Sequence, residues 1–466
     1  MTTTKQLLAR TYDLATTYLD GVRERRVGSL ADYEALLGAM GGALPNAPAD
    51  PLAIINELAA TAERGLVATP GPRHFGFVLG GVLPAALAAD WLASAWDQNA
   101  FSFVLSPAAT VVEEVARQWL TELLGLSPEM SLGIVTGGTM GNFTGLAAGR
   151  HALLARAGWD VEEQGLFGAP ELPVVTSEES HITIFASLQM LGMGRARVTR
   201  VAADEQGRMR ADALRSVLSG LSSPALVCAQ AGNVNSGAFD PIAEIAPIVH
   251  DAGGWLHVDG AFGAWAAASP RLKGLTAGLE LADSVSVDAH KWLNVPYDCG
   301  FVFVRDVAAH RAAMTLEAPY YAPAPSVARA NHNFVPEASR RARGFAVYAA
   351  LRSLGRDGLA ELVERCSRLA KRMAVRLAAE PGVRILNDVV LNQVLVRFDA
   401  RDGLDEDATT AAVIRRVQQD GTCWVGGTTW KGMHVMRVSV SNWSTTEEDI
   451  DRSADAIVRA ASAVAD

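Results

Sequence analysis

A lysine in the segment SVSVDAHKWLN has the surroundings that covalent amine chemistry needs. Lys291 follows an apolar run, with Asp288 and His290 beside it. A lysine at a strand end is commonly a solvated surface residue. Partial desolvation instead favours the neutral, nucleophilic amine that forms Schiff bases with carbonyl compounds. The segment therefore predicts a Schiff-base lysine at position 291.

A carboxylate ends another apolar run, WLHVDG, 32 residues before that lysine. Side chains alternate along a strand, so His257 and Asp259 are expected on one face. In a parallel sheet Asp259 and Lys291 would both lie at the carboxyl edge, where α/β proteins bind ligands. The alternatives are a turn cap at Asp259 or an iron site of two histidines and one carboxylate, made with His290. The iron site leaves Lys291 unexplained.

The segment VTGGTMGNFTGLAAGR places glycines where a strand gives way to a helix. Backbone N–H groups at a helix N-terminus bind phosphate, and glycine lets an anion approach the chain closely. Gly137, Gly138 and Thr139 therefore predict a phosphate cradle, with an ordinary turn as the alternative. No Gly-Lys-Ser/Thr follows, which excludes a Walker A loop.

A histidine lies near a further strand end. His181 follows the run LPVVTS by a few residues, so it belongs to the same predicted sheet edge. A capping or surface role is the alternative, and the shared edge is what makes His181 a candidate.

Six short apolar runs predict the sheet that positions these groups: LGIVTG, LPVVTS, ALVCAQ, WLHVDG, SVSVDA and GFVFVR. They lack polar alternation, and most are separated by the length of a crossover helix, as in buried parallel strands. GFVFVR follows its neighbour closely, so we expect it to be antiparallel. The pattern predicts an α/β fold with a helical N-terminal segment over 1–74, a large, mostly parallel sheet domain over 75–346 and a small α/β domain over 347–466.

Helix starts are indicated by cap residues. Ser29 is a candidate N-cap for SLADYEALLGAM, and Asp50 precedes a proline at a first helical position. Ser106, followed by Pro107, predicts the start of a longer amphipathic helix.

The composition is that of a globular protein without a basic surface. The 466 residues are 49% hydrophobic and carry a formal net charge of −10, so no surface for nucleic acid or anionic lipid is indicated. The four scattered cysteines form no Cys-x-x-Cys pair, which speaks against a disulfide framework or a zinc site. Charged residues interrupt the first twenty residues, unlike a signal peptide. We expect a cytoplasmic protein that acts on a small molecule, without a metal.

The order of these motifs resembles the pyridoxal-phosphate-dependent group II amino-acid decarboxylases, the aromatic L-amino-acid decarboxylase type. The blocks that carry the resemblance are TGGT, HVDGAF and DAHKWLN, and similarity extends from HFGFVLGGVLPAALAADWL to MRVSVSNWSTTEEDI. The resemblance implies a fold type I pyridoxal 5'-phosphate enzyme, a lyase that converts an L-amino acid, which we expect to be aromatic, to the amine and carbon dioxide. The alternatives are an aldehyde synthase and a decarboxylase of acidic amino acids. A silent scaffold is disfavoured because the lysine, carboxylate and histidine are all present.

The resemblance also implies roles for the residues at the ring of the cofactor. Lys291 would hold the cofactor as an internal aldimine, and Asp259 would pair with the pyridine nitrogen and keep it protonated. His181 would stack on one face of the ring, and Ala261 would pack on the other.

The resemblance assigns the phosphate to Gly138, Thr139 and His290. This chain departs from the aromatic type at Asp288, where that type commonly has asparagine. The departure weakens the transfer of individual phosphate contacts. Arg437 lies on a C-terminal strand where related transaminases hold a substrate carboxylate, and a structural salt bridge is the favoured alternative.

Three further expectations rest on the resemblance. A loop tyrosine, Tyr320 or its neighbour Tyr321, would deliver the proton that completes the amine. The family is homodimeric, and the N-terminal segment would wrap around the partner. His74, Phe75 and Phe77 are candidates for an aromatic substrate pocket, although apolar residues are equally expected in a dimer core.

Overall fold

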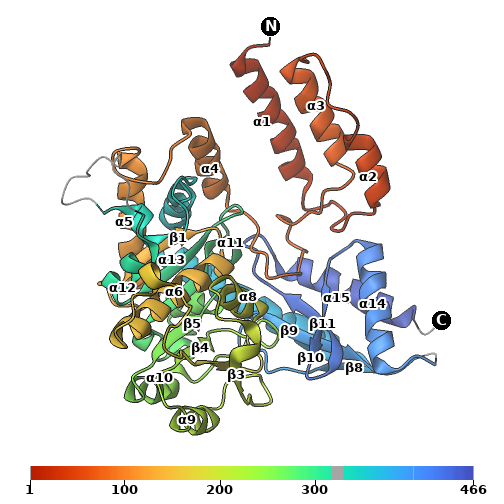
Figure 1. The fold of residues 1–466 in the computed structure, drawn as a ribbon. Helices are drawn as coiled ribbons and strands as arrows, with labels where there is room; N and C mark the ends of the chain where they lie inside the picture. Colours follow the sequence, from red (N-terminus) through yellow and green to blue (C-terminus); the bar gives the residue numbers. More distant parts are fainter. Residues whose placement is uncertain (1, 317–328, 402, 465–466) are drawn as a thin grey trace. The chain divides into compact units, whose positions relative to one another are not determined.

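In a computed structural model, residues 2–316, 329–401 and 403–464 are described. They form two compact units (Figure 1). The larger unit holds Gly80–Lys371 and Asn387–Gln393, and the smaller unit holds Met1–Leu79, Arg372–Leu386 and Val394–Asp466.

The larger unit is built on a seven-stranded sheet. Its strands are β1 (Ser131–Val135), β2 (Val174–Ser177), β3 (Val198–Val201), β4 (Leu226–Gln230), β5 (Trp255–Asp259), β6 (Ser284–Asp288) and β7 (Gly300–Val304). Their order is β1-β7-β6-β5-β4-β2-β3, with parallel pairing from β6 through β5, β4 and β2 to β3. Strand β7 runs antiparallel to both β1 and β6. The predicted α/β fold, the six predicted strands and the antiparallel orientation of GFVFVR are confirmed.

Strand β3 was not predicted. It is short and lies at the edge of the sheet, with Thr199 and Arg200 exposed. An edge strand with polar, solvated side chains lacks the continuous apolar run that marked the other strands.

Helices of the larger unit pack against this sheet (Figure 1). They are α4 (Pro84–Trp96), α5 (Pro107–Leu123), α6 (Gly138–Arg156), α7 (Val161–Gln164), α8 (Ile182–Met190), α9 (Ala211–Ser219), α10 (Ile242–Asp251), α11 (Ala289–Trp292), α12 (Val307–Met314) and α13 (Gly344–Ala378), which is broken at Gly355. Helix α6 contacts β5, β6 and β7 as well as α8 and α12.

Glycine recurs at every fourth position on the sheet-facing side of α6: Gly141, Gly145 and Gly149. A Cβ at Gly145 would lie 2.8 Å from ring atoms of His257, and one at Gly149 would lie 2.8 Å from the Trp255 ring. Glycine inside a helix costs ~1 kcal/mol relative to alanine. The close approach that these glycines allow brings the start of α6 within hydrogen-bond distance of β5 and β6.

The smaller unit combines N-terminal helices with a C-terminal sheet. Its elements are α1 (Thr4–Gly21), α2 (Tyr33–Met40), α3 (Pro51–Ala62), β8 (Val383–Ile385), β9 (Gln393–Phe398), α14 (Glu406–Asp420), β10 (Gly426–Trp430), β11 (Met433–Ser439) and α15 (Glu447–Ser462). The sheet order is β10-β11-β9-β8. None of the residues of α1, α2 or α3 is buried.

The predicted cap at Ser29 is wrong. Helix α2 begins after Asp32, whose carboxylate accepts a hydrogen bond from Ala35 N at 2.8 Å. The Ser29 hydroxyl instead accepts from Ala31 N and donates to Arg64 O. Ser29 and Asp32 are both residue types that cap helices. Asp32 is the one whose side chain accepts a hydrogen bond from the first turn of α2.

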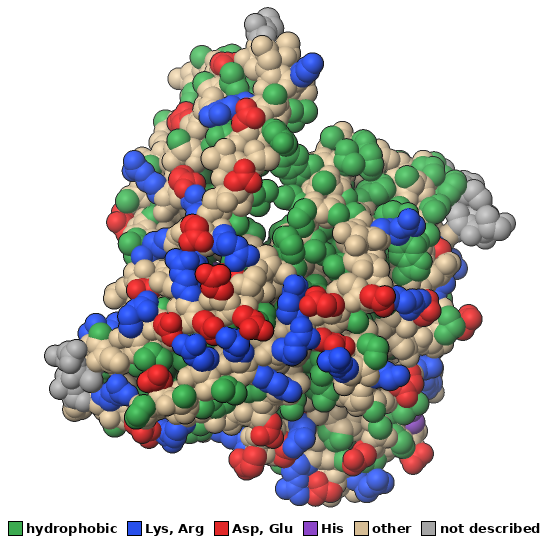
Figure 2. Space-filling model, turned by 180° about the vertical axis from the view of Figure 1, so that it is seen from behind, with side chains coloured by type: hydrophobic (Ala, Val, Ile, Leu, Met, Phe, Trp, Pro, Cys, Tyr) green, Lys and Arg blue, Asp and Glu red, His purple; other side chains and the backbone are tan. Residues whose placement is uncertain are grey.

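Charged side chains of both signs are interspersed over the face shown in Figure 2, without a basic field. Among the described helices, none combines the length and the apolar character that a bilayer crossing requires.

Candidate active site

Lys291 lies on the single turn α11 that follows β6. Its Nζ is 2.9 Å from Oδ2 of Asp288, and the Asp288 side chain is 3% exposed. The chain has four other lysines, and all are exposed: Lys5, Lys273, Lys371 and Lys431. The one lysine that is partly buried is therefore the one that the sequence predicts as the nucleophile, and it has a buried counter-ion.

The chain packs so closely on this turn that Gly80 has no room for a side chain. A Cβ there would lie 1.5 Å from the backbone oxygen of Lys291. Leu83 N donates to the backbone oxygen of Asn294 at 2.8 Å, which ties the same segment to the residues after α11. Sequence reasoning missed Gly80, whose only signal is a glycine pair in an apolar stretch.

The glycine turn before α6 lies against the same residues. A Cβ at Gly137 would lie 2.8 Å from the His290 ring, and one at Gly138 would lie 3.0 Å from Oδ2 of Asp288. The structure thus brings the predicted phosphate cradle, Asp288, His290 and Lys291 together. Thr139 follows in the first turn of α6, and its backbone oxygen accepts from the Ser187 hydroxyl.

His290 is held in one orientation. Cys299 N donates to its Nδ1 at 3.1 Å, and the ring stacks on Tyr297 with centroids 4.4 Å apart. Burial lowers the pKa of His290, although the Asp288 carboxylate opposes this shift. Because Nδ1 accepts, the neutral ring carries its proton on Nε2, which is 3.6 Å from Oδ1 of Asp288.

Asp259 ends β5 and is held by two donors. Ala261 N donates to Oδ1 at 3.1 Å, and Asn142 Nδ2 donates to Oδ2 at 3.0 Å. His257 Nε2 contacts the oxygen of the same Asn142 side chain at 2.9 Å. Both strand residues therefore face α6, as the alternation predicts. Asn142 was not predicted, and its only signal is a polar side chain among the glycine and alanine of a buried helix.

His181 is the N-cap of α8, so its capping alternative is realised. Its Nδ1 accepts from Thr183 N at 3.4 Å and lies 2.8 Å from the Thr183 hydroxyl oxygen. That hydroxyl also accepts from Asn142 Nδ2 at 3.1 Å. His181 is thereby linked to Asp259 through two intervening side chains.

The iron-site alternative fails on the hydrogen bonds of His257. Its Nδ1 contacts the Ser284 hydroxyl at 2.8 Å while Nε2 contacts Asn142, so both ring nitrogens are occupied. Within residues 2–316, 329–401 and 403–464, no cluster of three or more His, Cys, Asp or Glu side chains could hold a metal ion.

The buried histidines predict a loss of stability in mild acid. Burial lowers the pKa of His257 to about 4, although nearby Asp259 opposes the shift. Between pH 6.5 and 4 the unfolded chain binds a proton at His257 and the folded chain does not. The free energy of unfolding therefore decreases as the pH is lowered. By pH 5 the loss from His257 is about 2 kcal/mol. We expect the urea concentration at the midpoint of unfolding to be lower at pH 5 than at pH 7.

A variant of His257 separates this effect from general acid lability. His257→Gln should flatten the dependence of the urea midpoint on pH relative to the wild type. Equal slopes in the wild type and His257→Gln would refute the assignment.

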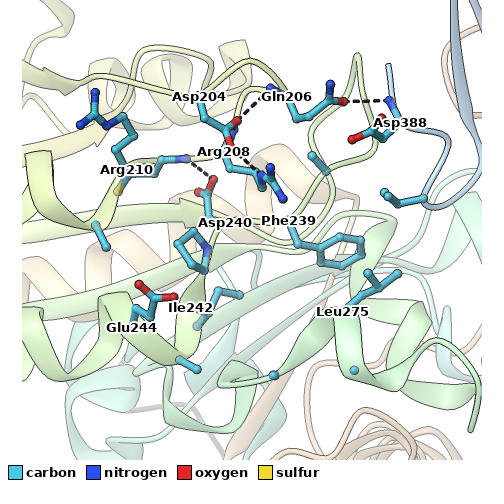
Figure 3. A pocket seen from close by; sticks show the side chains of 18 of the residues that line it. Asp204, Gln206, Arg208, Arg210, Phe239, Asp240, Ile242, Glu244, Leu275 and Asp388 are labelled. Atoms are coloured by element: carbon cyan, nitrogen blue, oxygen red, sulfur yellow. Dashed lines mark hydrogen bonds and ion pairs between the residues drawn. The ribbon is translucent and has the colours of Figure 1, made fainter. Parts of the chain in front are cut away.

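A cavity of about 680 Å³ lies elsewhere in the larger unit (Figure 3). None of Lys291, Asp259 or His181 lines it. Several of its charged groups are partnered: Arg208 pairs with Asp204, and the two oxygens of Asp240 accept from the backbone N–H groups of Met209 and Gln230. The candidate active site is therefore at the sheet edge and not in this cavity.

The groups gathered at the carboxyl edge match three requirements of one small molecule. An amine suits an aldehyde, a carboxylate with spare lone pairs suits a protonated pyridine nitrogen, and a glycine turn at a helix start suits a phosphate. Pyridoxal phosphate carries all three groups. The fold and the site define a pyridoxal-phosphate enzyme of the α/β type.

Comparison with known proteins gives the family. The chain belongs to the pyridoxal-dependent decarboxylases, because residues 36–400 match the pyridoxal-dependent decarboxylase conserved domain. It is 32% identical over 380 residues to L-2,4-diaminobutyrate decarboxylase of Rhizobium meliloti (strain 1021), covering 80% of this chain and 74% of that protein. It is 25% identical over 457 residues to aromatic-L-amino-acid decarboxylase of Bacillus atrophaeus, covering 96% of this chain and 93% of that protein.

The fold has close counterparts among solved structures. The structure of Oryza sativa TDC with PLP and tryptamine matches with a TM-score of 0.92 at 22% identity, covering 99% of this chain and 98% of that one. The protein is therefore a pyridoxal-phosphate-dependent amino-acid decarboxylase, a carboxy-lyase.

The residues present fit the cofactor. Side chains at Gly137 and Gly138 would fill the cradle, so glycine at both positions keeps it open. Asp288 replaces the expected asparagine with a negative charge, and the Lys291 contact at 2.9 Å compensates for that charge.

The structure does not place two sets of predicted residues at this site. Tyr320 and Tyr321 lie outside the described residues. His74, Phe75 and Phe77 belong to the smaller unit, as does Arg437 on β11.

Proposed function

We propose that the protein decarboxylates an aromatic L-amino acid to its amine, with Lys291 as the residue that holds the cofactor. The observation that carries the assignment is the 2.9 Å contact between Lys291 Nζ and buried Asp288, beside the glycine turn. When bound, pyridoxal phosphate supplies an electron sink for the electron pair left behind by carbon dioxide.

The chain's own side chains hold and orient that group. Asp259 keeps a proton on the ring nitrogen, because a carboxylate held by Asn142 and Ala261 N still has lone pairs to accept it. His181 would cover one face of the bound ring and exclude water there, and Ala261 would lie on the other face.

The phosphate is assigned to the start of α6. Gly138 and Thr139 present backbone N–H groups there, and the His290 Nε2–H donates to the same anion. Because Nδ1 of His290 accepts from Cys299 N, its donor is directed away from that contact.

The aromatic substrate class is supported by the similarity to aromatic-L-amino-acid decarboxylase of Bacillus atrophaeus, which covers 96% of this chain. The smaller unit also holds an aromatic cluster. His74 stacks on Trp424 with centroids 5.0 Å apart and planes 2° apart, and Phe77 stacks on the same indole at 5.3 Å. The Phe77 side chain is 63% exposed. The predicted role of His74 and Phe77 in an aromatic substrate pocket stays a prediction.

A second candidate substrate is L-2,4-diaminobutyrate. The observation in its favour is the 32% identity to a decarboxylase of that amino acid, the higher of the two identities given above.

The deciding experiment incubates the protein, loaded with pyridoxal phosphate, with phenylalanine, tyrosine, tryptophan, glutamate and diaminobutyrate separately. Mass spectrometry then identifies the product. Amine from an aromatic substrate supports the proposal, and aldehyde points to the synthase alternative. Turnover of diaminobutyrate or glutamate alone would overturn the aromatic assignment. The role of Tyr320 in delivering the proton stays a prediction, tested by whether Tyr320→Phe shifts product from amine to aldehyde.

We also propose that the protein is a cytoplasmic homodimer. Helices α1, α2 and α3 bury none of their residues, yet they carry exposed apolar side chains: Leu8, Tyr12, Leu37, Met40, Ile54 and Leu58. Further hydrophobic side chains gather at the upper right of the face in Figure 2, and α4 and α5 expose Trp91, Leu92, Trp96 and Val111. Exchange across a two-fold axis would cover both copies of such a surface.

Sedimentation equilibrium tests this assembly. We expect twice the mass of the chain, about 99 kDa from 49.3 kDa per chain. An active, monodisperse species at the mass of one chain would refute the dimer.

A further inference from the structure

Asn142 uses every hydrogen-bonding position of its side chain. Its Oδ1 accepts from His257 Nε2 at 2.9 Å and from the Ser286 hydroxyl at 2.5 Å. Its Nδ2 donates to Asp259 Oδ2 at 3.0 Å and to the Thr183 hydroxyl at 3.1 Å. The residue is fully buried. A primary amide has two donors and two lone pairs, so this side chain is saturated.

The chemistry of Asp259 determines which way the amide faces. An ionised carboxylate only accepts, so the group facing Asp259 must be the amide nitrogen. The amide oxygen then faces His257 and Ser286, and each of these must supply a proton. The orientation of Asn142 is therefore set by its neighbours.

That orientation determines the tautomer of His257. Its Nε2 carries the proton that Asn142 accepts, and its pKa is lowered by burial, so the ring is neutral and Nδ1 accepts from the Ser284 hydroxyl. The Ser284 oxygen in turn accepts from Trp255 Nε1 at 3.0 Å. The hydrogen bonds of His257, Ser284 and Trp255 therefore allow one arrangement of their protons.

The same reasoning reaches His181. The Thr183 oxygen accepts from Asn142, and His181 Nδ1 accepts from Thr183 N. The Thr183 hydroxyl proton is therefore directed to Nδ1, 2.8 Å away. His181 then carries its own proton on Nε2.

We propose that Asn142 is a positioning residue of the active site: one buried amide orients the Asp259 carboxylate and, through the Thr183 hydroxyl, holds His181 in the Nε2–H tautomer. The inference rests on the proposed roles of Asp259 and His181. Asn142 joins the partner of the ring nitrogen to the residue on the ring face, so that replacing Asn142 disturbs both.

The first test replaces the donor and keeps the shape. Asn142→Asp retains an acceptor for His257 and Ser286 but places a carboxylate oxygen against Asp259, where two acceptors repel. We expect the dissociation constant of pyridoxal phosphate, measured by equilibrium dialysis against apoprotein, to rise tenfold or more. Thr144→Val on the same helix is the control, because the buried Thr144 hydroxyl bonds only the backbone oxygen of Met140. The dissociation constant of pyridoxal phosphate for Thr144→Val should match that of the wild type.

The second test removes the hydrogen bond between the Thr183 hydroxyl and His181 Nδ1. Thr183→Val removes the hydroxyl, and Thr183→Ser keeps it. In ¹⁵N spectra of histidine-labelled apoprotein, assigned with His181→Gln, the wild type and Thr183→Ser should show His181 as the Nε2–H tautomer. Thr183→Val should show a mixture of tautomers and a lower kcat, with cofactor affinity unchanged.

The outcomes separate this inference from the proposed function. A wild type that binds no pyridoxal phosphate contradicts the proposed function. A wild type that binds it, with a folded Asn142→Asp protein that binds equally well, overturns the positioning role. An unchanged His181 tautomer in Thr183→Val overturns the link to His181. Near-ultraviolet circular dichroism reports whether Asn142→Asp is folded, and if it is not, the Thr183 pair decides.

Discussion

Lys291→Ala is expected to lose covalent attachment of pyridoxal phosphate and to lower decarboxylation by roughly three or more orders of magnitude, ~4 kcal/mol of transition-state stabilisation. The reason is that Lys291 is the one partly buried lysine and lies beside Asp288, whereas the remaining four lysines are exposed. The visible absorption of the bound cofactor and the rate of carbon dioxide release measure the two losses.

Two controls accompany this variant. Lys273→Ala removes an exposed lysine and should keep the absorption and rate of the wild type. Removing Lys291 also leaves the buried Asp288 carboxylate without its partner, which is destabilising. The double variant Lys291→Ala with Asp288→Asn relieves that charge, and near-ultraviolet circular dichroism shows whether it is folded. Turnover near the wild-type rate by Lys291→Ala or by the double variant would contradict the assignment.

Asp259→Asn is expected to bind the cofactor more weakly and to lose roughly two or more orders of magnitude in rate, ~3 kcal/mol. The change keeps the size of the side chain and removes the charge that holds a proton on the ring nitrogen. It also places a neutral amide where Ala261 N and Asn142 both donate, so one of these donors loses its acceptor.

The rate is measured at saturating cofactor, which separates weak binding from slow chemistry. Asp251→Asn, at an exposed carboxylate, is the matched control and should behave as the wild type. Decarboxylation by Asp259→Asn within a few-fold of the wild type would show that Asp259 is only a turn cap.

The large sheet was predictable because burial on both faces leaves a local signature. The strands β1, β4, β5, β6 and β7 are buried throughout, and each appears as a continuous apolar run. Parallel pairing then brings Asp259 and Lys291 to one edge without further information. Edge strand β3 has no such run, so the same reasoning passed over it.

The contacts within the site were less predictable, because they join segments far apart in sequence. Asn142 bonds to Thr183, Asp259 and Ser286, at separations of 41, 117 and 144 residues. No spacing pattern encodes such pairs. Gly80, which packs on the backbone of Lys291, is a similar case.

The central claim is that Lys291 holds pyridoxal phosphate, and reduction with borohydride tests it most directly. The loaded protein is reduced, digested and mapped by mass spectrometry. Only five peptides can carry the label, since the chain has five lysines. The reduced pyridoxyl group is expected on Lys291 alone. Label on Lys5, Lys273, Lys371 or Lys431, with Lys291 unmodified, would contradict it.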